Sequence, residues 1–219
     1  MQQIVGMDYS INSPGCVKFL VNEVLEITDI SYIGFSSVKK IVALDKNIIY
    51  YHKNQFLNQF EKYYWFRDKC LEFMSLTEKS YVGIEDYAFG ATGRVFSIAE
   101  STFAIKSQIY NSGAVLRTYP PTLIKKFSTG KGNANKRDMF VSFYGTPDTS
   151  LLQHLSEGSP QEDLIDAYFV AKMLLNELKV RRGIIPLSSL TPKQIECFNA
   201  TSKSHPDNIL MRDFIQKEN

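Results

Sequence analysis

Short runs of apolar and β-branched residues, separated by turn-forming residues, occupy the first 35 positions of the chain. The first run ends at Asp8, and the polar segment 10–15 that follows it contains Ser, Asn, Pro and Gly. Such runs bounded by turn residues are typical of β-strands, and short connections favour antiparallel pairing. We therefore expect three strands, over residues 3–8, 16–25 and 27–35, that form an antiparallel meander.

Farther along the chain the apolar residues recur every three to four positions, which is typical of amphipathic helices. Long helices are predicted over residues 56–74, 95–109 and 160–180, and short ones over 135–143 and 191–200. Two further strands are predicted over residues 80–85 and 114–119. Segment 38–55 shows no clear period.

This order of elements predicts the architecture. A strand, a helix and a second strand between residues 80 and 119 indicate a right-handed parallel crossover. Three antiparallel strands followed by that unit and by more helices predict an α/β fold. We expect a mixed five-stranded sheet flanked by helices, in which strands 3–8 and 80–85 are neighbours.

The composition of this 219-residue chain bears on its cellular location and on its possible ligands. Three cysteines without a CxxC pair indicate reduced thiols, and three scattered histidines argue against a zinc site. No apolar run is long enough to cross a bilayer and the N-terminus has no signal pattern, so we expect a cytoplasmic protein without a membrane partner. The net charge of +2 does not by itself indicate nucleic acid.

Carboxylates end or interrupt three apolar stretches. Asp8 and Glu85 each close a predicted strand, while Asp163 and Asp166 lie three residues apart on one face of the last long helix. Each has a plainer explanation. Asp8 could begin a turn, Glu85 could be an ordinary strand-end residue, and Asp163 could favour a helix start at which residues 159–162 form a capping box.

Together the four carboxylates predict a metal site. Two like charges about 4 Å apart repel by roughly 4 kcal/mol at an effective dielectric constant of 20, so such a cluster needs protons or cations. Oxygen ligands without His or Cys select Mg²⁺, for which Mn²⁺ can substitute. Two such ions suit phosphodiester hydrolysis. We expect two Mg²⁺ ions, with Asp8 as a bridging ligand.

A basic, glycine-rich stretch over residues 123–139 could contact phosphates, although charge runs of this kind are often solvated loops. Lys136 is the best candidate to hold the scissile phosphate. The other candidate DNA-binding residues in the stretch are Lys125, Lys126, Lys131 and Arg137.

The segment after Glu85 offers aromatic residues as well. Tyr87 or Phe89 could stack on an exposed base, and Arg94 could hold a phosphate. The alternative is that both rings pack in the core.

Four motifs in this order resemble RuvC-type Holliday junction resolvases, in particular the phage members, within the RNase H-like superfamily. They are IVGMDYS, YVGIEDYAF, PPTLIKKFSTGKGNANKRDM and EDLIDAYFVAKML. The resemblance implies an RNase H-like nuclease domain over residues 1–180, with a C-terminal helical extension over 181–219. It also implies a homodimer that nicks paired strands of branched, four-way DNA junctions with Mg²⁺, in a bacterial or phage-infected cell.

By the same resemblance, four residues are metal ligands: Asp8, Glu85, Asp163 and Asp166. Lys136 is the active-site lysine, and Tyr87 or Phe89 enters the junction centre. The chain departs from the family pattern in longer segments over 36–80 and 143–159, and in Ser10, which stands where a glycine is common.

Other functions stay open. The same site could serve a flap, replication-fork or RNA–DNA hybrid nuclease, or the fold could be a non-catalytic nucleic-acid-binding protein. An actin-like nucleotide-binding protein is disfavoured, because the turn after Asp8 lacks the glycines that cradle phosphate.

Overall fold

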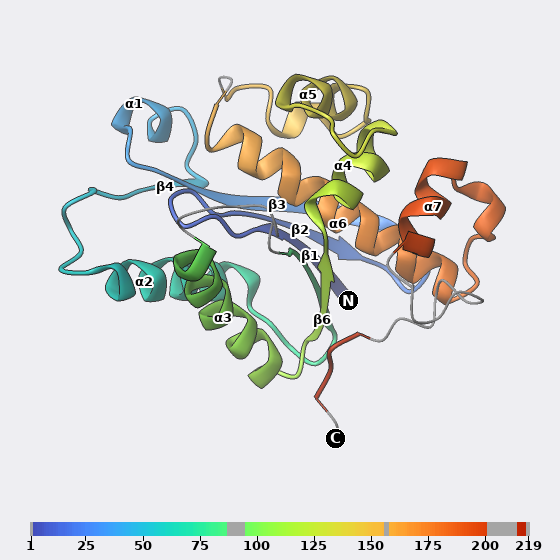
Figure 1. The fold of residues 1–219 in the computed structure, drawn as a ribbon, viewed down its shortest axis with the longest axis horizontal. Coiled ribbons are helices and arrows are strands. Elements are labelled where there is room, and N and C mark those ends of the chain that lie inside the picture. Colours follow the sequence, from blue (N-terminus) through green and yellow to red (C-terminus); the bar gives the residue numbers. More distant parts are fainter. Residues whose placement is uncertain (1, 87–94, 156–157, 201–213, 218–219) are drawn as a thin grey trace.

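The computed structural model describes residues 2–86, 95–155, 158–200 and 214–217. Within them, six strands form one mixed sheet in the order β4-β3-β2-β1-β5-β6 (Figure 1). The strands are β1 (Gln2–Asp8), β2 (Gly15–Val21), β3 (Ile27–Ser36), β4 (Ile48–Tyr50), β5 (Ser80–Glu85) and β6 (Val115–Tyr119). Strands β1, β2 and β3 pair antiparallel, whereas the pairs β1–β5, β5–β6 and β3–β4 are parallel.

The predicted mixed sheet, its antiparallel meander and its parallel crossover are confirmed, but the count of five strands is wrong. The sixth strand, β4, lies in the segment 38–55 that shows no period. It contains only three residues and pairs with the end of β3 at the edge of the sheet. A strand this short has no room for a clear alternation of apolar and polar residues.

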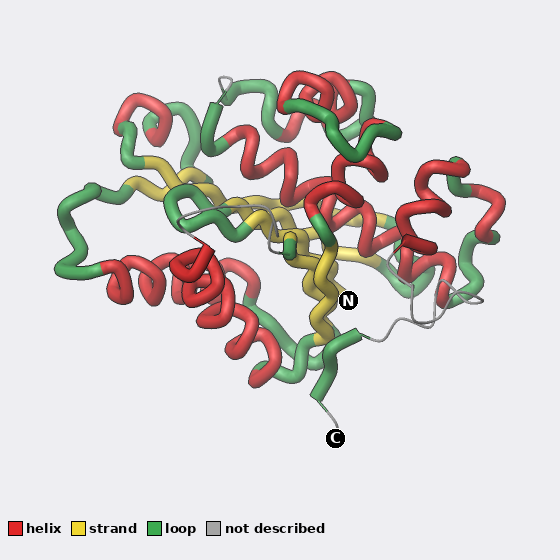
Figure 2. Tube along the Cα trace, in the orientation of Figure 1, coloured by secondary structure: helices red, strands yellow, loops and turns green. Residues whose placement is uncertain are grey.

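Helices cover both faces of the sheet, as Figure 2 shows in red against the yellow strands. Helices α2 (Gln59–Met74) and α3 (Val95–Asn111) pack on one face. Helix α6 (Gln161–Arg181) lies on the other face, with α4 (Pro121–Thr129), α5 (Lys136–Tyr144) and α7 (Pro192–Ala200) around it. The remaining pieces are short: α1 (Lys39–Val42), η1 (Thr149–Leu151) and η2 (Leu187–Ser189).

Helix α4 lies in the basic stretch that was expected to be either a DNA contact or a solvated loop. Its start has Pro121 at the first helical position, and its end has Gly130 in the left-handed region at φ 81°. Both are normal helix boundaries, since proline suits the first turn and glycine the residue after the last. Pro120 and Pro121 therefore end β6 and also begin α4.

Alternation along β1 decides which side chains meet α6. Val5 and Met7 face α2 and α3, whereas Ile4 faces α6. Gly6 shares the face of Ile4, because successive side chains point to opposite sides of a strand. A Cβ at Gly6 would lie 2.1 Å from the Ala167 carbonyl oxygen. The absence of a side chain there lets α6 lie directly on the sheet.

Replacing Gly6 by Ala is therefore expected to lower the free energy of unfolding by about 3 kcal/mol, because the new methyl group overlaps helix backbone that cannot rotate away. Gly145→Ala is the matched control, since its nearest neighbour would be 3.4 Å away. Urea denaturation of both variants measures the difference. Equal stabilities would mean that α6 can move off β1 at little cost.

The residues after α6 return to the body of the protein. Helix α7 packs on α4, and Lys126 forms an ion pair with Glu196 of α7. Ile215 pairs with Leu116 of β6 through two backbone hydrogen bonds of 2.8 and 2.9 Å. The division of the chain at residue 180 stays a prediction. None of the described helices is long and apolar enough to span a membrane.

Candidate active site

Two carboxylates lie side by side where β1 and β5 end. The strands are parallel and Met7 pairs with Ile84, so Asp8 and Glu85 are the next residues on neighbouring strands. Asp8 is on the same side of β1 as Gly6, and Glu85 is on the same side of β5 as Gly83. A Cβ at Gly83 would touch Val170 of α6. Both carboxylates therefore point to the face that α6 covers.

The N-terminal end of α6 brings Asp163 and Asp166 to the same place. Gly15, at the start of β2, pairs with Asp8, and a Cβ on Gly15 would lie 2.7 Å from the backbone oxygen of Asp163. Asp166 immediately precedes Ala167, which lies on Gly6. The structure thus gathers the four acidic residues that the sequence selected from β1, β5 and α6.

Burial and the closeness of the charges raise the pKa values of these carboxyl groups. Burial raises the pKa of Asp8 well above its ordinary value, and the charges of Glu85, Asp163 and Asp166 raise it further. Burial and then Asp166 raise the pKa of Glu85 to about 7. Burial and then Asp163 raise the pKa of Asp166 to about 6. The four carboxyl groups therefore repel one another when ionised, which is the condition for recruiting a cation.

The four carboxylate side chains do not converge on one point. Among the described residues, no three Asp, Glu, His or Cys side chains stand in an arrangement that would hold an ion. The donor set itself fits a hard cation such as Mg²⁺, since it offers carboxylate oxygens without imidazole or thiolate.

The Asp163 side chain has a hydrogen-bond partner within the protein. Its carboxylate accepts a hydrogen bond from Ser159, whose hydroxyl is also 2.6 Å from the Ser13 oxygen. Ser13 in turn donates to the Phe35 carbonyl at 3.0 Å. The plainer alternative, a capping box over residues 159–162, is therefore wrong: Pro160 precedes the helix, and no side chain caps its backbone. Ser159 hydrogen-bonds the Asp163 side chain instead.

Two lysines face this carboxylate cluster. Lys136 begins α5, is largely exposed, and forms an ion pair with Glu162 of α6. Lys125 on α4 lowers the pKa values of both Glu85 and Asp166 by its charge. The two lysines and Asp166 line one small cavity of about 70 Å³.

Lys125 is the residue whose importance the sequence reading missed. It was expected only as one of several candidate DNA-binding residues, together with Lys126, Lys131 and Arg137. Its helical position places it toward the carboxylates, while Lys126, the next residue, reaches Glu196 of α7. Lys131 and Arg137 are exposed. The candidate residues Tyr87, Phe89 and Arg94 lie outside the described residues.

The raised pKa of Glu85 predicts how stability depends on pH. Its ordinary value is 4.5 and its value in the fold is about 7, so between these pH values the folded chain binds more protons than the unfolded chain. The free energy of unfolding in EDTA should therefore fall as the pH rises from about 4.5 to about 7.

Glu85→Gln should make this fall smaller, because the amide does not titrate. Urea denaturation of both proteins in EDTA at several pH values measures the effect. Identical pH profiles for the parent and the variant would show that Glu85 ionises normally and does not share the site.

No protein-family model matches the sequence, and no curated protein does. The fold nevertheless is that of a known class of structures, the RuvC-like fold. A structure of Thermus thermophilus RuvC is 15% identical, with a TM-score of 0.53, and the match covers 83% of this chain and 96% of that one.

A second structure, T. thermophilus RuvC in complex with Holliday junction substrate, is 18% identical with a TM-score of 0.54. The match covers 84% of this chain and 98% of the other. A complex of Fowlpox virus resolvase with Holliday junction DNA scores 0.46 at 13% identity, over 80% of this chain and 98% of that one. The RuvC-like fold expected from the four motifs is confirmed.

Proposed function

We propose that this protein is a Mg²⁺-dependent, structure-selective DNA endonuclease that resolves four-way junctions. The observation that carries the proposal is the meeting of Asp8, Glu85, Asp163 and Asp166 at one end of the sheet, with raised pKa values. The fold adds support, because RuvC in one matching structure is in complex with Holliday junction substrate.

The four carboxylates are the proposed ligands of two Mg²⁺ ions. When bound, such ions lower the pKa of an attacking water and stabilise the leaving oxygen of a phosphodiester. Asp8 ends the strand beside that of Glu85, and the charges of Glu85, Asp163 and Asp166 all act on it, which suits a ligand that would be shared by both ions. Ser159 donates a hydrogen bond to the Asp163 carboxylate and would orient it as a ligand.

The lysines are proposed to receive the phosphate. Lys136 is exposed and can exchange Glu162 for a phosphate oxygen, and Lys125 adds a second positive charge beside Asp166. Lys131 and Arg137 are exposed and would contact the backbone farther from the cut. Lys126 is paired with Glu196, so its contribution to DNA binding would be smaller.

Cutting a junction in paired strands requires two active sites, and we propose a homodimer. Large apolar side chains exposed on α2 and α3 support a second copy of the chain as the partner: Phe60, Tyr64, Phe96 and Phe103. Both helices lie on the face of the sheet away from α6 (Figure 1), so a partner there would leave the carboxylates open to DNA. A cytoplasmic location in a bacterial or phage-infected cell stays a prediction.

Cleavage of a panel of DNA substrates tests the proposal. A mobile four-way junction, a linear duplex, a flap, a replication fork and an RNA–DNA hybrid are compared at fixed salt, with Mg²⁺ and with EDTA. We expect cleavage of the junction that requires Mg²⁺ and leaves the duplex intact. Preferred cleavage of flaps, forks or hybrids would keep the metal site and reject resolution. Cleavage of none would favour a non-catalytic nucleic-acid-binding protein.

A further inference from the structure

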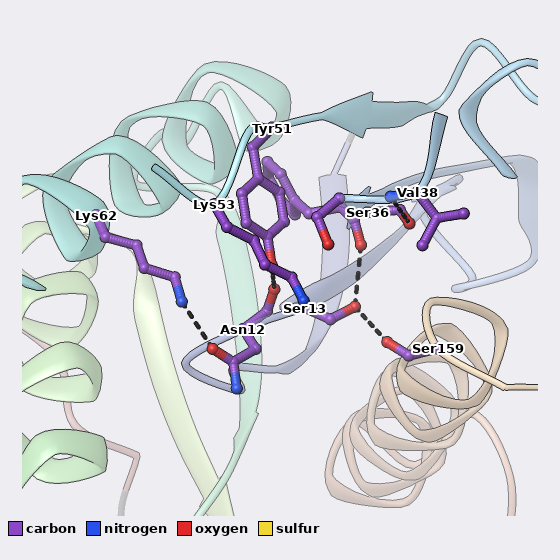
Figure 3. Close-up of a pocket in the computed structure, with 10 residues that line it drawn as sticks. Asn12, Ser13, Ser36, Val38, Tyr51, Lys53, Lys62 and Ser159 are labelled. Carbon is purple, nitrogen blue, oxygen red and sulfur yellow. Dashed lines mark hydrogen bonds between the residues drawn. The ribbon is translucent and has the colours of Figure 1, made fainter. Parts of the chain in front are cut away.

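A larger hollow adjoins the carboxylate site on the side of Ser13 and Ser159. Its volume is about 440 Å³. The turn between β1 and β2, the end of β3, the segment after β4 and helix α2 form its walls (Figure 3). We call it the serine–lysine pocket. Its lining includes these polar and basic side chains: Asn12, Ser13, Ser36, Ser37, Lys53 and Lys62.

The lining of this pocket has the chemistry of an oxyanion site. It contains two lysines, four serines and one asparagine, and none of the residues that line it is acidic. Lys62 donates to the Asn12 side chain at 2.7 Å. Lys53 extends across the pocket toward Ser13 in Figure 3. Cationic and hydroxyl donors without a carboxylate favour a phosphate oxygen as the ligand.

The pocket is held rigidly beside the candidate active site. Tyr51 donates to the Asn12 carbonyl at 2.7 Å, and Ser13 donates to the Phe35 carbonyl, so the turn that carries Asn12 and Ser13 is fixed to β3 and to the segment after β4. Ser159 also lines the pocket and hydrogen-bonds the Asp163 carboxylate. Ser159 therefore lines the pocket and also bonds one proposed metal ligand, Asp163.

The lysines of the two sites come from different parts of the fold. Lys125 and Lys136 belong to α4 and α5, whereas Lys53 follows β4 and Lys62 belongs to α2. A DNA strand whose phosphate lies at the carboxylates can therefore meet positive charge from two separate walls. The positions of these lysines would set the direction in which a DNA strand crosses the carboxylate site.

We propose that the serine–lysine pocket binds a phosphodiester group of the cut DNA strand, adjacent to the phosphate that is hydrolysed. The inference rests on the proposed function, since it needs DNA at the carboxylates. Lys53 supplies the positive charge, and the serine hydroxyls of Ser36 and Ser37 donate to the phosphate oxygens.

The test measures DNA binding rather than cleavage. In an Asp166→Asn background with EDTA, Lys53→Glu is compared with Lys79→Glu. Lys79 is exposed and precedes the start of β5, at the end of that strand away from Glu85. We expect Lys53→Glu to weaken junction binding roughly tenfold and to reduce the slope of log K against log salt by about 0.9, the value for one lost phosphate contact. Lys79→Glu should leave both unchanged. Equal effects of the two variants would overturn the inference.

Acetylation of lysines, read by mass spectrometry, locates the contact without a mutation at the pocket. Bound DNA should protect Lys53 and leave Lys79 reactive. Bound DNA with a fully reactive Lys53 would overturn the pocket and leave the proposed function standing. Equal protection by inorganic phosphate alone would reassign the pocket to a free small anion. Failure to bind any branched DNA would overturn both proposals.

Discussion

Replacing Asp166 by Asn is expected to reduce junction cleavage about a thousandfold or more, which corresponds to roughly 4 kcal/mol of transition-state stabilisation. The amide keeps the size of the side chain and removes the negative charge that a metal ligand supplies. Asp166 is flanked by Glu85, Asp163 and the two lysines of the site, which suits a metal ligand.

This loss should occur in a folded protein that still binds DNA. Burial and Asp163 raise the pKa of Asp166 to about 6, so its charge is unfavourable in the metal-free fold. Removing that charge should leave the stability in EDTA at pH 7.5 equal to or above that of the parent. Junction binding in EDTA should be retained, because Asn adds no repulsion to phosphate.

Asp29→Asn is the matched control for Asp166→Asn. Asp29 is exposed on β3 and pairs with Leu20, at the end of the sheet away from the carboxylates. It should cleave the junction at the parental rate. Single-turnover cleavage with Mg²⁺ compares the three proteins. A parental rate for Asp166→Asn would remove this residue from the site and would contradict the proposed ligand set.

The second large effect concerns stability. Glu177 of α6 is fully buried and bridges three partners. Arg117 of β6 donates to it twice, at 2.7 and 3.1 Å, Tyr119 donates at 2.6 Å, and Arg181 donates from the next turn of α6. Both arginines also lie over the ring of Phe214. This cluster fastens α6, β6 and the C-terminal segment together.

Glu177→Ala should lower the free energy of unfolding by about 3–5 kcal/mol, because it leaves the buried Arg117 guanidinium without a counter-charge. Glu177→Gln should fall between the parent and Glu177→Ala. Urea denaturation measures all three. The control is Glu72→Ala, which breaks the exposed pair with Lys69 and should cost about 0.5 kcal/mol. Equal losses for Glu177→Ala and Glu72→Ala would contradict the buried-cluster explanation.

Local patterns predicted much of the fold and most of the candidate site. The strand over residues 80–85 was placed with its observed bounds, because an apolar run closed by Glu85 is a strong signal. The order of elements then predicted that Asp8 and Glu85 end neighbouring strands, which the parallel register of β1 and β5 bears out. Helical spacing placed Asp163 and Asp166 on one face of α6.

What the sequence did not predict depends on contacts between distant segments. Strand β4 exists because the end of β3 offers an open edge, and the pairing of Ile215 with Leu116 has no local signal. Lys125 was read only as part of a basic stretch, because its place beside Glu85 and Asp166 depends on how α4 packs against distant segments. The serine–lysine pocket joins residues that are up to 147 positions apart, from Asn12 to Ser159.

Mapping the cuts in a four-way junction, with each of the four strands end-labelled in turn, tests the central claim most directly. The proposed function predicts nicks at symmetric positions in two strands of opposite arms, present with Mg²⁺ and absent with EDTA or in Asp166→Asn. Nicks that appear in a linear duplex at the same rate would contradict structure selectivity. The absence of nicks in all four strands with Mg²⁺ would contradict the nuclease itself.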